Sequence, residues 1–395
     1  MVSSLTRLYG FENLELIEDA VQDSFQKALL KFREEPLPDN LKAWLRTSIK
    51  NRAIDLFRKS KTKSKYENIS GPGFMSMGEV FSEHEIADSQ LSLLFSICHP
   101  ALKTKDQIIF ALKTFSGFSM EEISSALLLD KENTKKALQR ARKKIRAQGI
   151  SFAIPSGADL VDRIQSVHLA IYLLFNEGFH SSSKDSLLRQ DLVAEALRLN
   201  GLLLERFKDT NSRALMALMC FHAGRIHGKL DERGGLIKLK YQDRRKWNFE
   251  LIMKGHMHME QAADADVYSR FHWEAAIAGE FVNAVNFEST NWKRLTHFYE
   301  NLIALSPSPI NFLNLAAILN QDKKHEKALA ILEQIEAASL KGREYLYCSV
   351  YAEIHASLED YQEALSWHQK ALQMVKNESE KLLIKDKIFN LETYL

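Results

Sequence analysis

Two stretches of this chain concentrate basic side chains, and such side chains can bind the phosphate groups of nucleic acid. They are Lys42–Lys65 and Lys131–Arg146, whereas the whole chain has a formal net charge of only +2. Within the second stretch only Glu132 offsets the positive charge, so pairing between neighbouring helical side chains cannot explain its composition. Local patches of charge, rather than the total, bind nucleic acid. We therefore predict that both stretches contact DNA.

Three predicted helices within Thr104–Ile150 must position the second basic stretch. Ser119 and Glu122 form the S-x-x-E pattern of a capping box, which opens a short helix. Asp130 is a suitable N-cap for the long basic helix that follows. A short helix, a tight turn and a long basic helix together predict a helix-turn-helix.

The basic helix of a helix-turn-helix enters the major groove with its N-terminus leading. Side chains of its first turn then lie nearest the base edges, and later cations lie nearest phosphates. The predicted base-edge contacts are Lys131, Asn133, Thr134 and Lys135. The predicted contacts farther along the helix are Gln139, Arg140, Arg142, Lys143 and Arg146.

Two helices are predicted around the first basic stretch, over Leu14–Phe32 and Leu41–Lys59. The apolar spacing predicts an inner stripe on each helix. In the first helix this stripe is Ile17, Ala20, Val21, Phe25, Ala28, Leu29 and Phe32, and in the second it is Leu41, Leu45, Ile49, Ala53 and Leu56.

Trp44 lies at the edge of the second inner stripe, beside the basic face. Two interpretations stay open: a core anchor, or an exposed aromatic ring that stacks on an unpaired base. Asp55, on the same helix, is expected to be a structural partner of Arg52 or Arg58 rather than a DNA contact.

Composition indicates an ordinary globular protein with an all-α fold. The chain has 395 residues, 45% hydrophobic and 26% charged, with only 7 Pro and 16 Gly. The three cysteines, Cys98, Cys220 and Cys348, form no C-x-x-C pair, which favours reduced core thiols in a cytoplasmic protein. Neither a signal peptide nor an apolar run near 18 residues is present, so we expect no membrane partner.

The sequence predicts no enzyme, no metal site and no cofactor. His256 and His258 are two residues apart, so on a helix their rings point to different faces. No H-E-x-x-H, P-loop, G-x-S-x-G or G-x-G-x-x-G pattern is present.

The C-terminal half predicts a nearly neutral helical domain with an internal repeat. The segments LNLAAILNQDKKHEKALAILEQI and YAEIHASLEDYQEALSWHQKALQMV align, with Ala328 matching Ala364. Their period is near that of the tetratricopeptide repeat, about 34 residues. Two interpretations stay open: a surface that binds a protein or peptide partner, or a pure scaffold.

The stretches EDAVQDSFQKALLKF and PDNLKAWLRTSIKNRAIDLFRK, with the helix-turn-helix, resemble regions 2 and 4 of an extracytoplasmic-function sigma factor of the sigma-70 family. The resemblance covers about residues 5–150. It implies that Asp19, Gln22, Asp23 and Lys27 contact the β′ clamp helices of core RNA polymerase. It implies −10 promoter contacts by residues 33–40 and by Lys50, Asn51, Arg52 and Arg58, and −35 contacts by the basic helix of region 4. Trp44, an aromatic ring beside the basic face, is a further candidate for the −10 contact.

The later motifs IYLLFNEGF, YQDRRKW and WEAAIAGE resemble the large helical extension of one sigma-factor subgroup, which implies control of the sigma core. The expected domains are a sigma region 2 with a short first helix at 1–60, a flexible linker at 61–84, region 4 at 85–150, a linker at 151–158, and the extension at 159–395 with repeats at about 309–376. We thus expect a sigma factor for promoter-specific initiation, tuned by its extension. The alternative is a helix-turn-helix regulator or signalling scaffold without polymerase contact.

Overall fold

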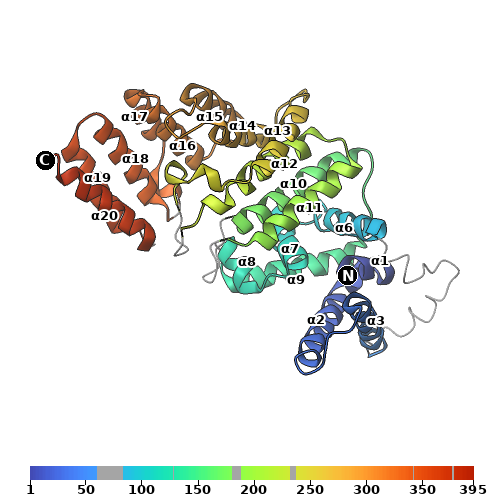
Figure 1. Cartoon of the computed structure of the whole chain (residues 1–395). Coiled ribbons are helices and arrows are strands. Elements are labelled where there is room, and N and C mark those ends of the chain that lie inside the picture. The colour runs from blue at the N-terminus through green and yellow to red at the C-terminus, as the bar shows by residue number, and fades with distance from the viewer. Residues whose placement is uncertain (60–82, 128, 180–187, 232–236, 341, 376–377) are drawn as a thin grey trace. The chain divides into compact units, whose positions relative to one another are not determined.

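The computed structural model describes residues 1–59, 83–127, 129–179, 188–231, 237–340, 342–375 and 378–395. Within these ranges helices form all the regular structure and no strand occurs, so the all-α prediction is confirmed (Figure 1). The chain divides into two compact units, Met1–Arg206 and Phe207–Leu395.

The first unit begins with a small helical group around the first basic stretch. Its elements are α1 (Val2–Tyr9), η1 (Phe11–Asn13), α2 (Leu14–Lys31) and α3 (Leu41–Lys59). Their shared core consists of Leu5, Ile17, Ala20, Ile49, Ala53 and Phe57. Helix α1 packs on both α2 and α6 (Glu83–Ile97), which links this group to the rest of the unit.

The predicted inner stripe of α2 is partly wrong. Phe25 and Leu29 are 44% and 75% exposed, whereas Ile17, Ala20 and Ala28 are buried. The core contacts of α2 come from α1 and α3, and they cover a narrower stripe than the apolar spacing predicts. An apolar strip on α2 therefore faces outward within the described part of this unit.

The helix-turn-helix is confirmed with its predicted caps. Its elements are α7 (Thr104–Ser116), α8 (Met120–Ala126) and α9 (Lys131–Gln148). The Ser119 N–H donates to the Glu122 carboxylate over 2.7 Å, and the Glu122 N–H donates to Ser119 Oγ over 3.2 Å. The Asp130 carboxylate accepts the Asn133 N–H over 3.1 Å and starts α9.

Helices α10 (Ala158–Phe179) and α11 (Gln190–Arg206) complete the first unit by packing on α6, and α10 also packs on α7. The predicted linker at 151–158 lies inside this unit, between α9 and α10. The predicted linker at 61–84 falls outside the described residues except for its last two positions, which belong to α6.

The second unit opens with four main helices, and short 3-10 turns lie between the first two of them. They are α12 (Thr210–Ala223), η2 (Ile226–Gly228), η3 (Leu239–Tyr241), η4 (Arg244–Lys246), α13 (Phe249–Ala262), α14 (Arg270–Asn283) and α15 (Trp292–Leu305). Helix α12 packs on α13 and α14, and α14 packs on α15.

The predicted sequence repeat corresponds to two helical hairpins. They are α16 (Pro309–Gln321) with α17 (His325–Leu332), and α18 (Glu344–Ser357) with α19 (Tyr361–Met374). Each hairpin turns through a non-glycine residue in the left-handed region, Lys323 with φ 60° and Glu359 with φ 65°. These turns are 36 residues apart (359 − 323), as are the matched alanines (364 − 328). The turn η5 (Ala337–Leu340) joins the hairpins, and α20 (Glu378–Glu392) follows them.

Candidate nucleic-acid interface

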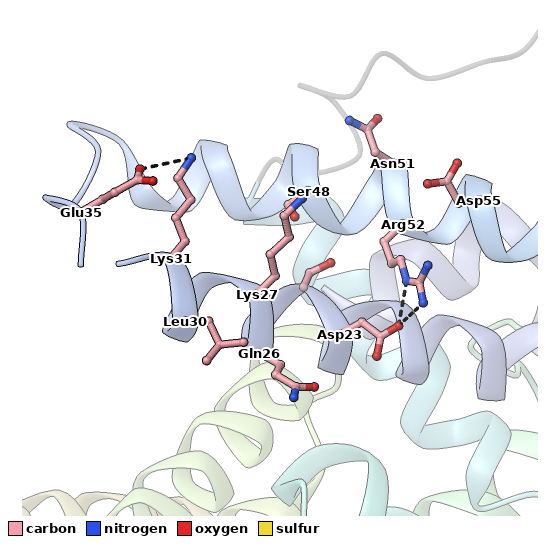
Figure 2. Close-up of a pocket in the computed structure, with 11 residues that line it drawn as sticks. Asp23, Gln26, Lys27, Leu30, Lys31, Glu35, Ser48, Asn51, Arg52 and Asp55 are labelled. Atoms are coloured by element: carbon pink, nitrogen blue, oxygen red, sulfur yellow. Dashed lines mark hydrogen bonds and ion pairs between the residues drawn. The ribbon is translucent and has the colours of Figure 1, made fainter. Parts of the chain in front are cut away.

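A groove of about 840 Å³ runs between α2 and α3 (Figure 2). It brings together Asp23 and Lys27, which the sequence assigned to polymerase binding, and Asn51 and Arg52, which it assigned to the −10 element. The lining carries equal numbers of acidic and basic groups. They are Asp23, Glu35 and Asp55 against Lys27, Lys31 and Arg52. The charges of the groove lining therefore balance, and the groove as a whole does not attract phosphate.

Arg52 pairs with Asp23 across this groove. Its Nε and Nη2 lie 2.7 and 2.6 Å from the same carboxylate oxygen, Asp23 Oδ2. Asp55 was expected to pair with Arg52 or Arg58, and for Arg52 this is wrong, because α2 presents a closer carboxylate than the neighbouring turn of α3. The pair joins one predicted polymerase contact to one predicted DNA contact.

Trp44 combines features of both its interpretations. Its ring packs edge-on against Phe32, with centroids 5.0 Å apart, and Lys31 Nζ lies 5.8 Å from its centroid. The side chain is nevertheless only half-buried. It is held in place by a neighbouring ring and keeps part of its surface accessible.

The outer strip of α2 contains residues that sequence reasoning missed. Asp19 and Gln22 are exposed, and Phe25 and Leu29 continue the same helical stripe. The exposure of two large apolar side chains beside polar ones is typical of a protein contact surface. Their helical spacing was visible in the sequence but predicted a core position instead.

The basic face of α9 is largely exposed, as the sequence predicts. Its exposed residues include Lys131, Asn133, Lys135, Gln139, Arg140 and Lys143. Thr134 corrects the prediction, because it is fully buried and its hydroxyl donates to the Asp130 carbonyl over 3.0 Å. This side chain supports the start of α9 rather than facing a base.

Three α9 cations pair with carboxylates of their own helix-turn-helix, one of them Lys136, whose Nζ lies 3.6 Å from Glu132 on the same helix. Lys131 pairs with Glu121 of α8, and Arg140 Nη2 lies 3.1 Å from Oδ1 of the buried Asp106 of α7. Lys135 and Lys143 have no ion-pair partner within the described part of the chain.

Arg142 and Arg146 instead bind carboxylates of α2. Arg142 lies 3.1 Å from Glu15 and also pairs with Glu18, and its side chain is only 18% exposed. Arg146 Nη2 lies 3.0 Å from Glu15, and its Nε donates to the Glu12 carbonyl over 3.1 Å. Thr114 of α7 donates to Glu18 over 3.1 Å. The end of α9 is thus docked on the start of α2.

Comparison with known sequences identifies the two halves of this interface. Residues 1–63 match the family Sigma-70 region 2, and residues 97–145 match the family Sigma-70, region 4. The chain therefore carries region 2 and region 4 domains of the sigma-70 family. As an RNA polymerase sigma factor it directs transcription initiation, binds core polymerase and promoter DNA, and catalyses no reaction itself.

Two relatives of this sigma factor match it to different extents. An uncharacterised protein of Rhizobium meliloti (strain 1021) is 31% identical over 335 residues, which cover 82% of this chain and 78% of that protein. A probable RNA polymerase sigma factor of Haemophilus influenzae is 27% identical over 143 residues, covering 32% of this chain and 74% of that protein. Residues 163–263 match the family of unknown function DUF6596. No solved structure matches.

Burial changes the acid strength of the α2 carboxyls in this sigma factor. Burial raises the pKa of Glu18, and the attraction of Arg142 only partly opposes that rise. Burial, Glu15 and Asp23 together raise the pKa of Asp19. Glu18 and Asp19 of α2 therefore bind protons more readily than free carboxyls would.

The described residues of the sigma factor contain no group of three His, Cys, Asp or Glu side chains that could hold a metal ion. All three cysteines are buried, and burial raises the pKa of Cys98 to about 12, so this thiol is unreactive at neutral pH. In the same part of the chain, no helix combines the length and the apolar character needed to cross a bilayer.

Proposed function

We propose that this protein is an extracytoplasmic-function type sigma factor that acts in the cytoplasm and reads the −35 element with α9. The observation that carries this proposal is the exposed row of polar and basic side chains on a capped recognition helix. Lys131, Asn133, Lys135 and Gln139 would face base edges, and Arg140 and Lys143 would face phosphates.

We propose that region 2 contacts the −10 element through one rim of the α2–α3 groove. Lys50, Asn51 and Arg58 are wholly or partly exposed on α3, and the accessible part of Trp44 can stack on an unpaired base. Arg52 would either stay with Asp23 or turn to the DNA. The cations supply backbone contacts while the aromatic ring captures a base.

The polymerase clamp would dock on the outer strip of α2. Asp19 and Gln22 provide polar contacts, and Phe25 and Leu29 add apolar area that the rest of the described unit leaves uncovered. Asp23 and Lys27 lie at the groove and would form its border. Apolar side chains with a polar rim are the usual composition of such a contact.

We propose that the docking of α9 on α2 is the resting state of the free sigma factor. While Arg142 and Arg146 bind Glu15 and Glu18, they cannot bind phosphates, and their position fixes region 4 against region 2. The exposed Arg146–Glu15 pair contributes little, about 0–1 kcal/mol. Arg142 and Glu18 are largely buried, and the cost of removing them from water offsets much of their attraction. This set of contacts between α9 and α2, which we call the latch, is therefore weak enough for polymerase or promoter DNA to open it.

The resting state can be tested by reversing the charge of the two glutamates. We expect Glu15→Lys/Glu18→Lys to bind promoter DNA about three- to tenfold more tightly than Asp162→Lys/Glu205→Lys, because only the first variant frees α9. Both variants gain the same charge, and Asp162 and Glu205 are exposed carboxylates elsewhere in the first unit. Equal affinities in the two variants would argue against the latch.

The second unit would tune this activity, with its tetratricopeptide-like hairpins offered to a protein or peptide partner. The support is a matching repeated turn and a chain that continues as a separate compact unit beyond Arg206. Run-off transcription with core polymerase and DNA from upstream of the gene should differ between the full chain and residues 1–206. Truncation at 158 would remove α10 and α11 from the first unit and confuse the result. Identical output from the full chain and residues 1–206 would exclude tuning.

A further inference from the structure

A cavity of about 290 Å³ lies between helices α12, α13, α14 and α15 of the second unit. This volume is at the lower end of the range of small-molecule sites, roughly 300–1,000 Å³. Its walls are largely aromatic, contributed by Phe221, Tyr268, Trp273 and Phe298, with two histidines. Neither regions 2 and 4 nor the repeated hairpins contribute a residue to it.

The aromatic rings of the lining form two mutually packed groups. Tyr268 meets Trp273 edge-on with centroids 5.4 Å apart, and Trp273 lies 6.1 Å from Phe298. On the other side, Phe221 meets His256 edge-on at 4.9 Å. Rings that support one another in this way keep their positions when a ligand enters, so the site is preformed.

Small residues on α14 leave the space open. Ala276 and Gly279 face the cavity where larger side chains would fill it. The backbone at Gly255 and at Gly279 lies close to the Phe221 ring and holds it in position. A Cβ built on Gly255 would lie 2.6 Å from this ring, and one built on Gly279 would lie 3.2 Å from it. The cavity therefore exists because small residues of α14 lie beside the Phe221 ring, which cannot move to fill the space.

One carboxylate lies in this aromatic wall. Glu280 is only 8% exposed, and Arg294 Nη1 lies 3.2 Å from its Oε2. The Arg294 side chain is itself 62% exposed, and its guanidinium lies 5.5 Å from the Phe298 centroid. A buried anion is thus balanced by a cation that stands mainly in solvent and can move away.

We propose that this cavity binds a small organic ammonium ion. Ring faces carry negative charge and attract cations, and several rings around one carboxylate strengthen that attraction. The ligand's ammonium group would meet Glu280, its apolar body would contact Phe221 and Trp273, and Arg294 would turn outward. Burial lowers the pKa of His272, so the neutral imidazole at the wall does not repel a cation.

An anionic or uncharged ligand fits these groups less well. A carboxylate would have to lie beside the negative ring faces and Glu280, with only the solvent-exposed Arg294 in its favour. An uncharged ligand would leave the existing Glu280–Arg294 pair in place and gain only apolar contact. Selectivity for the cation is therefore the distinguishing property of the site.

Three probes with the same ring and different charge test the proposal on the full chain: benzylamine, benzyl alcohol and benzoate. Isothermal calorimetry at neutral pH should give benzylamine a Kd of about 1 mM or lower, as expected for a ligand of about eight non-hydrogen atoms. The other two probes should bind at least about fivefold more weakly, because each loses the cation–π and ion-pair contacts. Similar binding of all three, or no binding of benzylamine at about ten times that concentration, would overturn the proposal.

Two substitutions should change benzylamine affinity in opposite directions. Glu280→Gln should weaken it about tenfold or more, since a charge-assisted contact is lost. Arg294→Gln should strengthen it by about two- to fivefold, because a competing cation is removed from an exposed position. The exposed carboxylate Glu300, on α15 outside the cavity, supplies a matched control as Glu300→Gln. If Glu280→Gln fails to fold, Arg294→Gln still tests the site. Weaker rather than stronger benzylamine binding by Arg294→Gln would refute the proposal. These binding measurements need no polymerase or promoter.

Discussion

Helices α3 and α9 have similar composition, but their cations are placed differently. Each is a long basic helix with a side-chain N-cap, Asn40 for α3 and Asp130 for α9. On α3, Arg52 pairs with a carboxylate, whereas Arg58 stands exposed. On α9, the first turn and the centre are exposed, while the end is held by carboxylates of α2.

This difference teaches that a basic stretch of sequence locates the cations but does not show which of them are free to bind DNA. In α9 the availability depends on docking between segments that are far apart in sequence. In α3 it depends on one local pair across a groove. The two helices therefore should respond differently to substitution, salt and pH.

Charge reversal on the exposed part of α9 should have the largest effect. We expect Lys135→Glu/Lys143→Glu to lower affinity for duplex promoter DNA about 10- to 100-fold and to flatten the log–log salt dependence by roughly 0.9 for each lost phosphate contact. Lys50→Glu/Arg58→Glu on α3 should reduce promoter opening but leave duplex −35 affinity within about threefold of the parent. Titration at several salt concentrations measures the first effect, and permanganate footprinting measures the second. Equal loss of duplex binding in both variants would remove the distinction between the helices.

Neutralising single α9 cations should reveal which are already engaged. Lys143→Gln should weaken duplex binding by about fivefold, as expected for one lost phosphate contact. Arg142→Gln should weaken it less than about twofold, because removal of the latch offsets the lost contact. Titration of both variants under one buffer gives the ratio directly. A larger loss for Arg142→Gln than for Lys143→Gln would mean that α9 binds DNA while undocked in the free protein.

Removal of the N-caps should have a smaller effect. Asp130→Ala and Asn40→Ala should each lower the free energy of unfolding by about 1 kcal/mol, because each leaves a helix-terminal N–H without its side-chain acceptor. Asp130→Ala should also lower duplex affinity modestly, since the first turn of α9 carries the predicted base contacts. Urea unfolding and DNA titration of both variants provide the comparison, with Asp162→Ala as an exposed control. A variant that loses DNA affinity without losing stability would show a direct contact instead.

The pH dependence of docking should be the smallest effect, and its sign is informative. Burial raises the pKa of Glu18, which lies in the contact with Arg142, so the docked state favours the protonated form of this carboxyl. Docking should therefore strengthen slightly as pH falls towards the raised pKa of Glu18, although protonation removes the negative partner of Arg142. Energy transfer between labels on α2 and α9 would report this change, with Glu18→Gln as the reduced-response control. Loosening of the parent protein in mild acid would show that attraction outweighs burial.

Local signals predicted most of the helical framework. The capping box at Ser119 and the N-cap at Asp130 depend on residues three positions apart, so the sequence contains the whole interaction. The same is true of the repeat marked by Ala328 and Ala364, whose helical hairpins follow from short-range spacing. Helix type and position therefore could be predicted without tertiary information.

Contacts between distant segments could not be predicted in this way. The Arg142–Glu18 pair joins residues 124 positions apart, and nothing in the spacing of either helix specifies it. Phe25 and Leu29 follow a helical apolar stripe, but their exposure depends on which other helices cover α2. Asp55 was the nearer carboxylate to Arg52 along the chain, whereas Asp23 is the nearer one in space. The sequence thus predicts which residue types can contact DNA better than it predicts which of those residues are free to do so.

The matching turns at Lys323 and Glu359 make the C-terminal array extendable. Because both hairpins reverse at the same backbone conformation, a block of 36 residues between equivalent points is a modular unit. Inserting a further copy of that block should lengthen the array by one hairpin without a new type of junction. Glycine at either turn would relieve the strain of the left-handed backbone conformation, about 1 kcal/mol, and so stabilise the lengthened protein.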